Sequence, residues 1–311
     1  MIKFLAISAL LCLGSVSYNK AMASAPMAKT QAPGFYRFML GDFEVTALYD
    51  GSVALPMNKL LSSVKKYQIE KQFKSAHLAT PTETPVNAYL INTGTKLILI
   101  DTGAAALFGP TLGKLLPNLK AAGYEASQVD EIYITHLHPD HVGGLFTDSK
   151  VSFPNAIVRA DKRDIEYWLS KENMEKAPEA NKGFFQGAMV SFDAYTKANK
   201  VQAFDGDTKL VEGIQAVKTY GHTPGHASYL VESKGQKLMV IGDLIHVGAV
   251  QFNDPTVTIA FDSDSVKAFG ERMKIFTEVA KDGTIIGATH IAFPGLGRLR
   301  HDGKKFEWLP L

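Results

Sequence analysis

The sequence predicts an α+β protein, an αββα sandwich in which two sheets pack face to face and helices cover the outer faces. Short apolar runs bounded by turn residues are followed by a helical segment, and this order occurs once in each half of the chain. Residues 97–100 and 238–241 are apolar at every position, which is typical of strands covered on both faces. No repeat of the solenoid kind occurs.

The first half is expected to begin with strands from residue 43. A hairpin is predicted over residues 88–91 and 97–100, joined by the turn sequence Asn-Thr-Gly-Thr. A helix is expected over 110–122, because Gly123 is a helix-ending residue. The β-branched, apolar run at 130–135 predicts a buried strand after it.

The second half repeats this order. A hairpin is predicted over 228–232 and 237–241, joined by Lys-Gly, and further strand-like runs cover 217–221 and 284–289. A helix is expected over 263–281, ending at Asp282-Gly283. The segment with Trp168, Phe184, Phe185 and Phe192 is interrupted by Pro178 and Gly183, so it fits a lid over a site or ordinary core packing.

The N-terminal residues are typical of an export signal. Lys3 precedes an apolar stretch over 4–16, and Ala21-Met-Ala23 matches an Ala-x-Ala cleavage site. The stretch is shorter than the roughly 20 apolar residues that a membrane anchor requires. We therefore expect a signal peptide at 1–23 that is cleaved after Ala23, and secretion to a bacterial periplasm. A loose arm is expected at 24–40 and a single domain at 41–311.

Composition excludes two further features. The chain has a formal net charge of +2, and the lysines near residues 65–74 fit the solvated face of a helix, so no nucleic-acid partner is expected. The sole cysteine, Cys12, lies in the signal segment. The mature protein therefore has no disulfide and no thiolate metal ligand.

The strongest motif is Thr-His-Leu-His-Pro-Asp-His-Val-Gly-Gly at 135–144, which places four metal ligands in six positions: His136, His138, Asp140 and His141. The preceding strand would deliver them at its carboxyl end, and Pro139 prevents a regular helix through the cluster. A looped His-x-His-x-Asp-His can direct its first two imidazoles to one ion and its last two groups to another. The spacing therefore suggests two metals.

Other strand-like runs end in His222, Asp243 and His290, at the rim of a buried sheet. A carboxylate has two oxygens, so Asp243 can bridge two ions about 3.5–4 Å apart, as in two-metal hydrolases. The mixture of imidazole and carboxylate suits zinc, and also manganese, cobalt or iron. His226 fits a turn with a structural histidine, and His77 and His301 are expected in solvent.

These residues together resemble the ligand set of the metallo-β-lactamase superfamily, with Asp101 in Leu-Ile-Asp-Thr-Gly matching its first motif. The resemblance implies the metallo-β-lactamase fold and a supporting hydrogen-bonding role for Asp101. It implies that Asp243 joins a first metal on His136, His138 and His222 to a second on Asp140, His141 and His290. Segments such as Lys-Gly-Phe-Phe at 182–185 resemble the methyl parathion hydrolases, which implies a homodimer and an aromatic leaving-group pocket of Phe108, Trp168 and Phe184.

Three functions are compatible with such a site. A dinuclear hydrolase would use a hydroxide bridging the two metals, since no other nucleophile is evident. A redox enzyme would use iron, but oxygen-reducing relatives usually have Glu where this chain has His138. A structural zinc protein would need four ligands, whereas seven are present here.

The substrate depends on the pocket wall. Absence of cysteine and the Asp bridge argue against a penicillin-type β-lactamase, and secretion argues against glyoxalase II and transfer-RNA processing enzymes. His246, Phe261 and Leu60 stand where methyl parathion hydrolases have leucine, leucine and arginine. His246 can hydrogen-bond a carbonyl or lactone oxygen, and Phe261 leaves less room for a tetrahedral phosphotriester. We predict lactone or aryl-ester hydrolysis with Asp243, Asp140 and His246 as catalytic residues, and weaker phosphotriester hydrolysis; the alternative is a methyl parathion phosphotriesterase.

Overall fold

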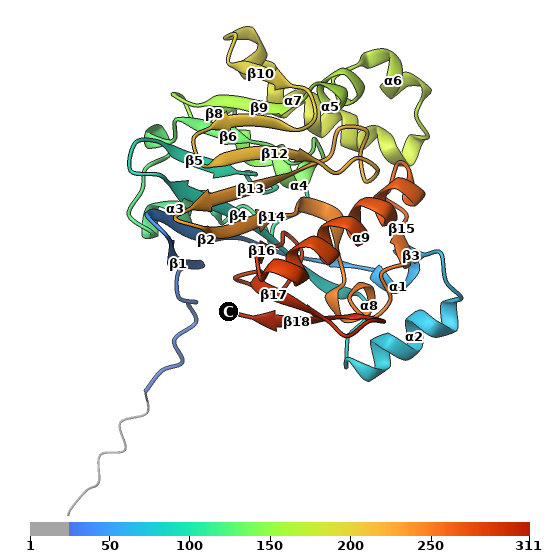
Figure 1. The fold of residues 1–311 in the computed structure, drawn as a ribbon. Helices are drawn as coiled ribbons and strands as arrows, with labels where there is room; N and C mark the ends of the chain where they lie inside the picture. Colours follow the sequence, from blue (N-terminus) through green and yellow to red (C-terminus); the bar gives the residue numbers. More distant parts are fainter. Residues whose placement is uncertain (1–24) are drawn as a thin grey trace, which may run out of the picture. The chain divides into compact units, whose positions relative to one another are not determined.

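The computed structural model describes residues 25–311, and the expected signal peptide lies outside this range (Figure 1). Residues 33–311 form one compact unit. Within the expected arm at 24–40, the last six residues are not loose, because Phe35–Leu40 forms a strand (β1) that pairs with β2. No helix in residues 25–311 has the length and apolar character needed to span a membrane.

Two seven-stranded sheets make up the centre of the unit. The first has the order β1-β2-β4-β5-β6-β9-β10, with β2 (Phe43–Leu55), β4 (Thr82–Asn92), β5 (Leu97–Ile100), β6 (Glu131–Tyr133), β9 (Ile157–Asp161) and β10 (Val201–Phe204). The second consists of β11 (Thr208–Val211), β12 (Ile214–Lys218), β13 (Ala227–Ser233), β14 (Gln236–Val240), β16 (Ile285–Gly287), β17 (Leu296–His301) and β18 (Phe306–Pro310).

Two short ribbons and nine α-helices complete the described chain. The ribbons pair β3 (Leu61–Ser62) with β15 (Thr258–Ile259), and β7 (Phe146–Thr147) with β8 (Lys150–Val151). The helices are α1 (Met57–Leu60), α2 (Lys66–Ser75), α3 (Leu115–Ala121), α4 (Pro139–Val142), α5 (Lys162–Trp168), α6 (Lys171–Lys176), α7 (Lys182–Lys197), α8 (Gly248–Gln251) and α9 (Ser265–Asp282).

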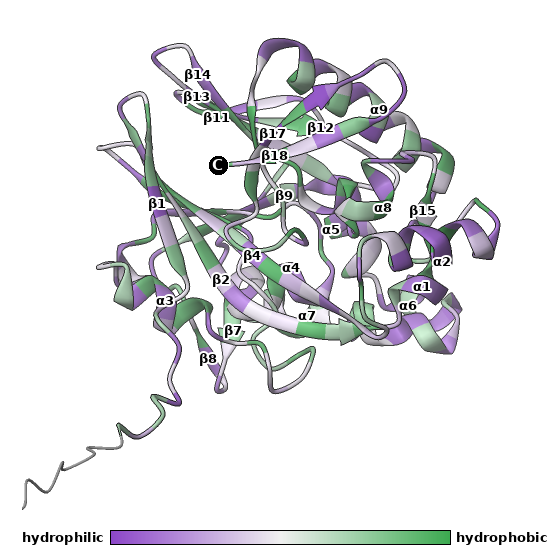
Figure 2. Cartoon of the chain, turned by 90° about the horizontal axis from the view of Figure 1, so that it is seen from below, coloured by the Kyte–Doolittle hydropathy of each residue, from purple (hydrophilic) through white to green (hydrophobic). Residues whose placement is uncertain are grey.

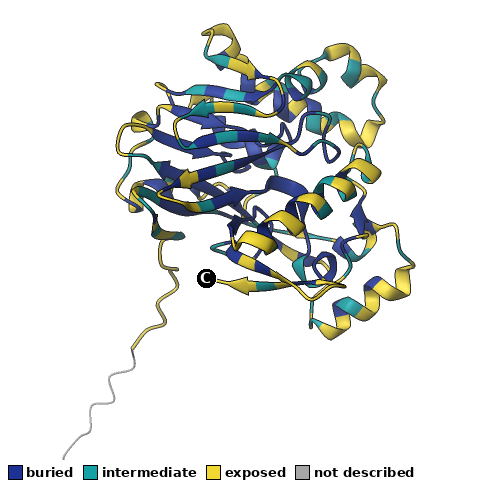
Figure 3. Cartoon of the chain, in the orientation of Figure 1, coloured by how far each residue is buried: buried dark blue, intermediate teal, exposed yellow. Residues whose placement is uncertain are grey.

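The elements form four layers, as the sequence predicted. One apolar cluster lies between the sheets and includes Tyr89 and Ile98 of the first sheet and Val231 and Leu238 of the second. A second cluster joins the outer face of the first sheet to α3, α5 and α7. A third joins the second sheet to α9. The strands are largely buried, whereas α2 and α6 are mostly exposed (Figure 3), and hydrophilic residues predominate on α2 (Figure 2).

The two predicted hairpins are confirmed. Strands β4 and β5 pair with Ile91 opposite Ile98. Strands β13 and β14 are joined by Lys234 and Gly235, whose φ values of 50° and 74° are those of a type I′ turn. The expected C-terminal helix is α9, which ends at Gly283 in the left-handed conformation.

The helix predicted over 110–122 is shorter than expected, because α3 covers only Leu115–Ala121. Gly113 has a φ of +84°, which is incompatible with a helix. The side chain of Asp50 accepts a hydrogen bond from the backbone N–H of Leu115 at 3.0 Å, and so takes the place of a preceding helical turn. A tertiary contact from β2 therefore sets where this helix begins.

Strand direction brings the ligand-bearing segments to one edge. Strands β5 and β6 are parallel in the first sheet. In the second sheet β12 and β14 are each antiparallel to β13, and β14 is parallel to β16, so all three end at the same edge. Each predicted metal ligand follows the carboxyl end of one of these strands, where loops can converge on a single site.

Candidate metal centre

The segment after β6 changes conformation at Pro139. The backbone is extended up to His138, and Pro139 then begins the short helix α4 as its first residue. The expectation that proline would bar a helix is therefore correct only for the residues before it, since proline is favoured at the first helical position. The turn points His136 and His138 toward one group of ligands, and Asp140 and His141 toward another.

Two ligand groups result, each with its ligand atoms within 4.8 Å of one another. The first comprises His136, His138, His222 and Asp243, and the second comprises Asp140, His141, Asp243 and His290. All seven residues named from the sequence are therefore brought together, in the predicted grouping.

Asp243 is placed as a bridge. Its Oδ2 lies 3.3 Å from Nε2 of His222 and 3.6 Å from Nε2 of His136. Its Oδ1 lies 3.1 Å from Nε2 of His141 and 3.2 Å from Nε2 of His290. Oδ2 is also 3.2 Å from Nε2 of His290, so the carboxylate as a whole lies between the two ligand groups, where two ions could share it.

Several buried polar atoms in this centre have no hydrogen-bond partner. They include Nε2 of His136, Nε2 of His141 and Oδ1 of Asp243. Unsatisfied polar atoms are rare in protein interiors because burying them without a partner costs free energy. These atoms point into the two ligand groups, so the donor set fits two divalent cations.

The charges of the centre explain the direction of its pKa shifts. Burial alone would raise the pKa of Asp243, but the surrounding imidazoles, His141 first among them, hold it well below its usual value. Burial lowers the pKa of His136 and His138 well below the ordinary value. Burial also acts to lower the pKa of His222, yet hydrogen bonds to Asp243 and Asp262 raise it to about 9.

Polar groups behind the ligands orient their rings. Asp101 accepts from Nδ1 of His141 at 2.8 Å and from the hydroxyl of Thr135 at 2.8 Å, which leaves Nε2 of His141 free for a metal. Asp101 has a φ of 61°, an unusual value that the tight turn after β5 imposes. Nδ1 of His290 donates to the carbonyl of Pro85 at 2.8 Å.

Sequence reasoning missed two of these supports. Asp262 lies 2.9 Å from Nδ1 of His222 and is buried, although it is 40 positions away in the chain. The sequence predicts a structural role for His226 but not its partner: Nε2 of His226 accepts the backbone N–H of Asp243 at 3.0 Å, and burial lowers the pKa of His226 to about 3, as suits an acceptor. No local pattern marks either contact, because both depend on how separate loops meet.

Aromatic side chains cover the first ligand group. The ring of His138 lies 4.9 Å from Trp168, edge on, and 4.8 Å from Phe184. Phe184 in turn lies 6.4 Å from Phe108 and 6.1 Å from Phe261. The predicted pocket residues therefore form one continuous wall.

The remaining residues of the predicted segment do not join this wall. Phe185 and Phe192 belong to the buried core on the outer face of the first sheet. Leu60 and the wall residue Phe261 both pack against a smaller apolar cluster, and the carbonyl of Leu60 accepts the backbone N–H of Ala260, next to Phe261. Leu60 thus supports the wall through the backbone of its neighbour.

His246 adjoins both ligand groups without belonging to either. Its Nε2 lies 3.1 Å from Oδ2 of Asp243, and its ring stacks on that of His290 at 5.1 Å. Nδ1 has no hydrogen-bond partner, and burial lowers the pKa of the ring although the nearby Asp243 acts to raise it, which favours the neutral imidazole. Phe261 lies 6.3 Å away on the aromatic side.

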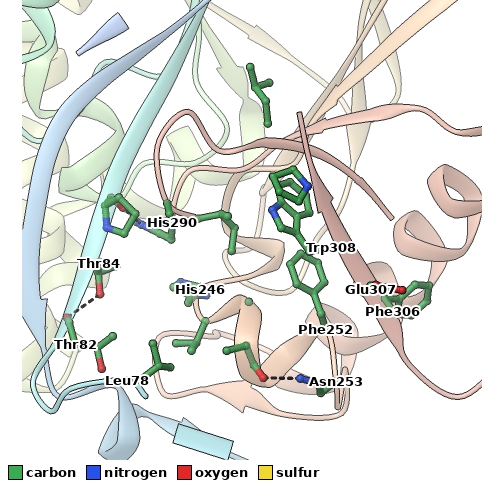
Figure 4. Close-up of a pocket in the computed structure, with 18 of the residues that line it drawn as sticks. Leu78, Thr82, Thr84, His246, Phe252, Asn253, His290, Phe306, Glu307 and Trp308 are labelled. Atoms are coloured by element: carbon green, nitrogen blue, oxygen red, sulfur yellow. Dashed lines mark hydrogen bonds between the residues drawn. The ribbon is translucent and has the colours of Figure 1, made fainter. Parts of the chain in front are cut away.

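A mainly apolar cavity of about 980 Å³ adjoins the centre at His246 and His290. Thr82 and Thr84 line one side of it, and the other side carries Phe252 and Trp308 (Figure 4). The rings of Phe252 and Trp308 are stacked 5.4 Å apart. A cavity of this size and polarity is suited to a small organic ligand.

The metallo-beta-lactamase superfamily model matches residues 81–290, from the start of β4 to the last predicted ligand. The chain belongs to the metallo-β-lactamase superfamily. Among solved structures, the hydrolase AbOPH of the beta-lactamase superfamily has a TM-score of 0.85 and 37% identity, with 91% of this chain and 99% of that chain covered. The fold class predicted from the sequence is thereby confirmed.

Lactonases are also similar to this chain. AidC, a dizinc quorum-quenching lactonase solved with the product N-hexanoyl-L-homoserine, has a TM-score of 0.82 and 27% identity, with 89% of this chain and 97% of that chain covered. An N-acyl homoserine lactonase from Bacillus cereus is 28% identical over 209 residues, or 61% of this chain and 75% of the lactonase. The protein is therefore a metal-dependent hydrolase of this superfamily.

Proposed function

We propose that the protein is a dinuclear metallohydrolase that opens lactones or cleaves aryl esters, with weaker activity on phosphotriesters. The observation that carries the proposal is the bridging position of Asp243 between two ligand groups, with neutral His246 beside them. Two divalent ions, most simply zinc, would lower the pKa of an attacking water and polarise the substrate's oxygen when bound. The similarity to a dizinc lactonase supports the same reaction class.

The chain's own residues would act on the substrate from two sides. Phe108, Trp168 and Phe184 would bind an aromatic leaving group, because their rings form a dry apolar wall over the first ligand group. Asp140 is the most exposed ligand, with a side chain that is 15% exposed, so it lies where water and substrate enter. Asp140 would take the proton that the attacking water loses and pass it to the leaving oxygen.

His246 would select the substrate. Its imidazole ring can hydrogen-bond a carbonyl or ring oxygen, which a leucine side chain cannot do. Phe261 narrows the same part of the wall, which disfavours the larger tetrahedral phosphotriester. The acyl part of the substrate would extend into the cavity bounded by His246 and His290.

The test is a comparison of initial rates on three substrates: dihydrocoumarin, naphthyl acetate and methyl parathion. The enzyme is purified with its metal content measured, so that rates refer to loaded protein. We expect kcat/KM to be highest for the lactone or the ester. Faster turnover of methyl parathion would instead make phosphotriester hydrolysis the main activity.

We further propose that the protein is exported to the periplasm and acts as a homodimer. The support for export is the sequence of residues 1–23, and the support for the dimer is the resemblance to methyl parathion hydrolases. Mass spectrometry of the exported protein should show a chain that begins at Ser24; an intact Met1 would refute cleavage. Light scattering after gel filtration should give twice the mass of one chain, and a monomer would refute the dimer.

A further inference from the structure

A buried carboxylate outside the proposed chemistry lies behind the first ligand group. Asp164, in the first turn of α5, is 0% exposed. Its Oδ2 accepts the backbone N–H of Leu137 at 3.0 Å and the hydroxyl of Thr223 at 2.9 Å, and its Oδ1 accepts the backbone N–H of Gly225 at 2.5 Å. The carboxylate therefore has three uncharged donors, from two different loops.

These donors come from the two loops that carry the three histidines of the first ligand group. Leu137 lies between His136 and His138, and Thr223 follows His222 directly. The loops belong to different sheets, and Asp164 hydrogen-bonds to both of them from a third element. Because hydrogen bonds to an ionised carboxylate are stronger than neutral ones, one side chain can hold both loops at a defined separation.

The packing around Asp164 leaves little freedom for adjustment. A Cβ on Gly225 would lie 2.6 Å from the backbone nitrogen of Asp164, so α5 and the second loop approach as closely as glycine allows. One turn further along α5, Trp168 meets the ring of His138 edge on at 4.9 Å. The position of α5 thus affects both the ligand loops and the aromatic wall.

We propose that Asp164 is a positioning residue that aligns the three imidazoles of the first ligand group and the wall residue Trp168. It does so by joining the loop after β6 to the loop after β12. The inference rests on the two-metal centre of the proposed function, but it does not depend on which substrate is cleaved.

The test compares two buried carboxylates at the beginning of α5, Asp164 in its first turn and Asp161 at its N-cap. Asp164→Asn keeps the volume but replaces one acceptor oxygen by an N–H group, which faces at least one of the three donors. Asp161→Asn is the matched control. Asp161 is also buried and accepts four hydrogen bonds, two from Arg163 and one each from Gly206 and Tyr220. Only Tyr220 lies in a ligand loop, and no donor to Asp161 is next to a metal ligand in the sequence, whereas Leu137 and Thr223 both are.

The readout is metal binding, measured by competition with a chromophoric chelator and by the absorption spectrum of the cobalt-substituted protein. Asp164→Asn should weaken the ion of the first ligand group about 10- to 100-fold, the range expected when a group supporting metal ligands is lost, and weakening of the second ion alone would overturn the proposal. The affected ion is assigned from the cobalt spectra of His222→Ala and His290→Ala, which each remove a ligand from one group. Asp161→Asn should lower thermal stability while both affinities stay within about twofold of wild type.

Thr223→Val provides a second variant if Asp164→Asn does not fold, since it removes only one of the three donors and keeps the side-chain volume. It should weaken the same ion to a smaller extent. Wild-type affinity for both ions in the variants that fold would overturn the proposal, and so would equal weakening by Asp161→Asn. A protein without lactonase activity that still shows this selective loss would refute the proposed substrate and leave the role of Asp164 supported.

Discussion

The two ligand groups share Asp243 but differ in charge and in access to solvent. The first has three imidazoles and lies beneath Trp168 and Phe184, with all its histidines buried. The second has two imidazoles and a second carboxylate, Asp140, which is partly exposed. Nitrogen ligands suit zinc, whereas added oxygen ligands accommodate manganese or iron more readily. We infer that the first group serves mainly to hold its ion, and the second also provides access for substrate.

The largest expected effect comes from removing the shared ligand. Asp243→Ala should abolish turnover and release at least one ion, because Asp243 belongs to both ligand groups. Metal content and kcat are measured on the same preparation. Full activity with one ion per chain, or after exhaustive chelation, would contradict the two-metal mechanism.

Replacing a carboxylate that supports a ligand should weaken the ion of one group and not the other. Asp262→Asn should weaken the first ion, and Asp101→Asn the second, each by about 10- to 100-fold. The reason is that Asp262 orients His222 and Asp101 orients His141. Stepwise dissociation constants from chelator competition measure both. If each variant weakened both ions equally, the two groups would not be independent.

The groups should also differ in the protons they release on binding metal. In the first, only His222 has a raised pKa, at about 9. In the second, burial opposes protonation, but neighbouring carboxylates raise the pKa of both His141 and His290. Metal must displace these protons, so affinity should rise with pH, by up to about tenfold per unit for each proton released.

We expect about one proton from the first group below pH 9 and more from the second. Calorimetry in buffers of different ionisation enthalpy counts them. The stability of the metal-free protein should change with pH in the opposite direction to its metal affinity. The stabilisation from the ion pair of His222 is fully present below the unfolded pKa of 6.5 and is lost as the pH rises through 9. Equal proton release from both groups would contradict this difference.

A smaller effect, on substrate preference, is expected from replacing His246, which adjoins both groups. His246→Leu removes a hydrogen-bonding ring and makes the site more apolar, so the ratio of phosphotriester to lactone turnover should rise roughly ten- to a hundredfold. The ratio of kcat/KM values for methyl parathion and dihydrocoumarin measures it. An unchanged ratio would show that His246 does not select the substrate.

The smallest effect concerns the cavity beside the second group. Leu78 lines it, so Leu78→Trp should narrow it and raise KM for long-chain acyl substrates by roughly tenfold or less. KM for a short-chain ester should stay the same, which provides the control within one variant. An equal change for both chain lengths would place the acyl group elsewhere.

The sequence alone determined the ligand set and the layered fold. His136 to His141 are close in the chain, and His222, Asp243 and His290 each follow an apolar strand, so periodicity and motif spacing identify them. Local hydrogen bonds and side-chain alternation decide strands and turns, which explains why both hairpins were predicted with the correct connections.

Only the tertiary structure decided which groups stand behind the ligands. Asp262, Asp164 and His226 lie in segments without a distinctive local pattern, and each acts through a contact between loops of different elements. The start of α3 was set in the same way, by Asp50 from a distant strand. Such contacts depend on the relative positions of packed elements, which local propensity does not encode, because the free energy that fixes them comes from long-range burial and hydrogen bonding.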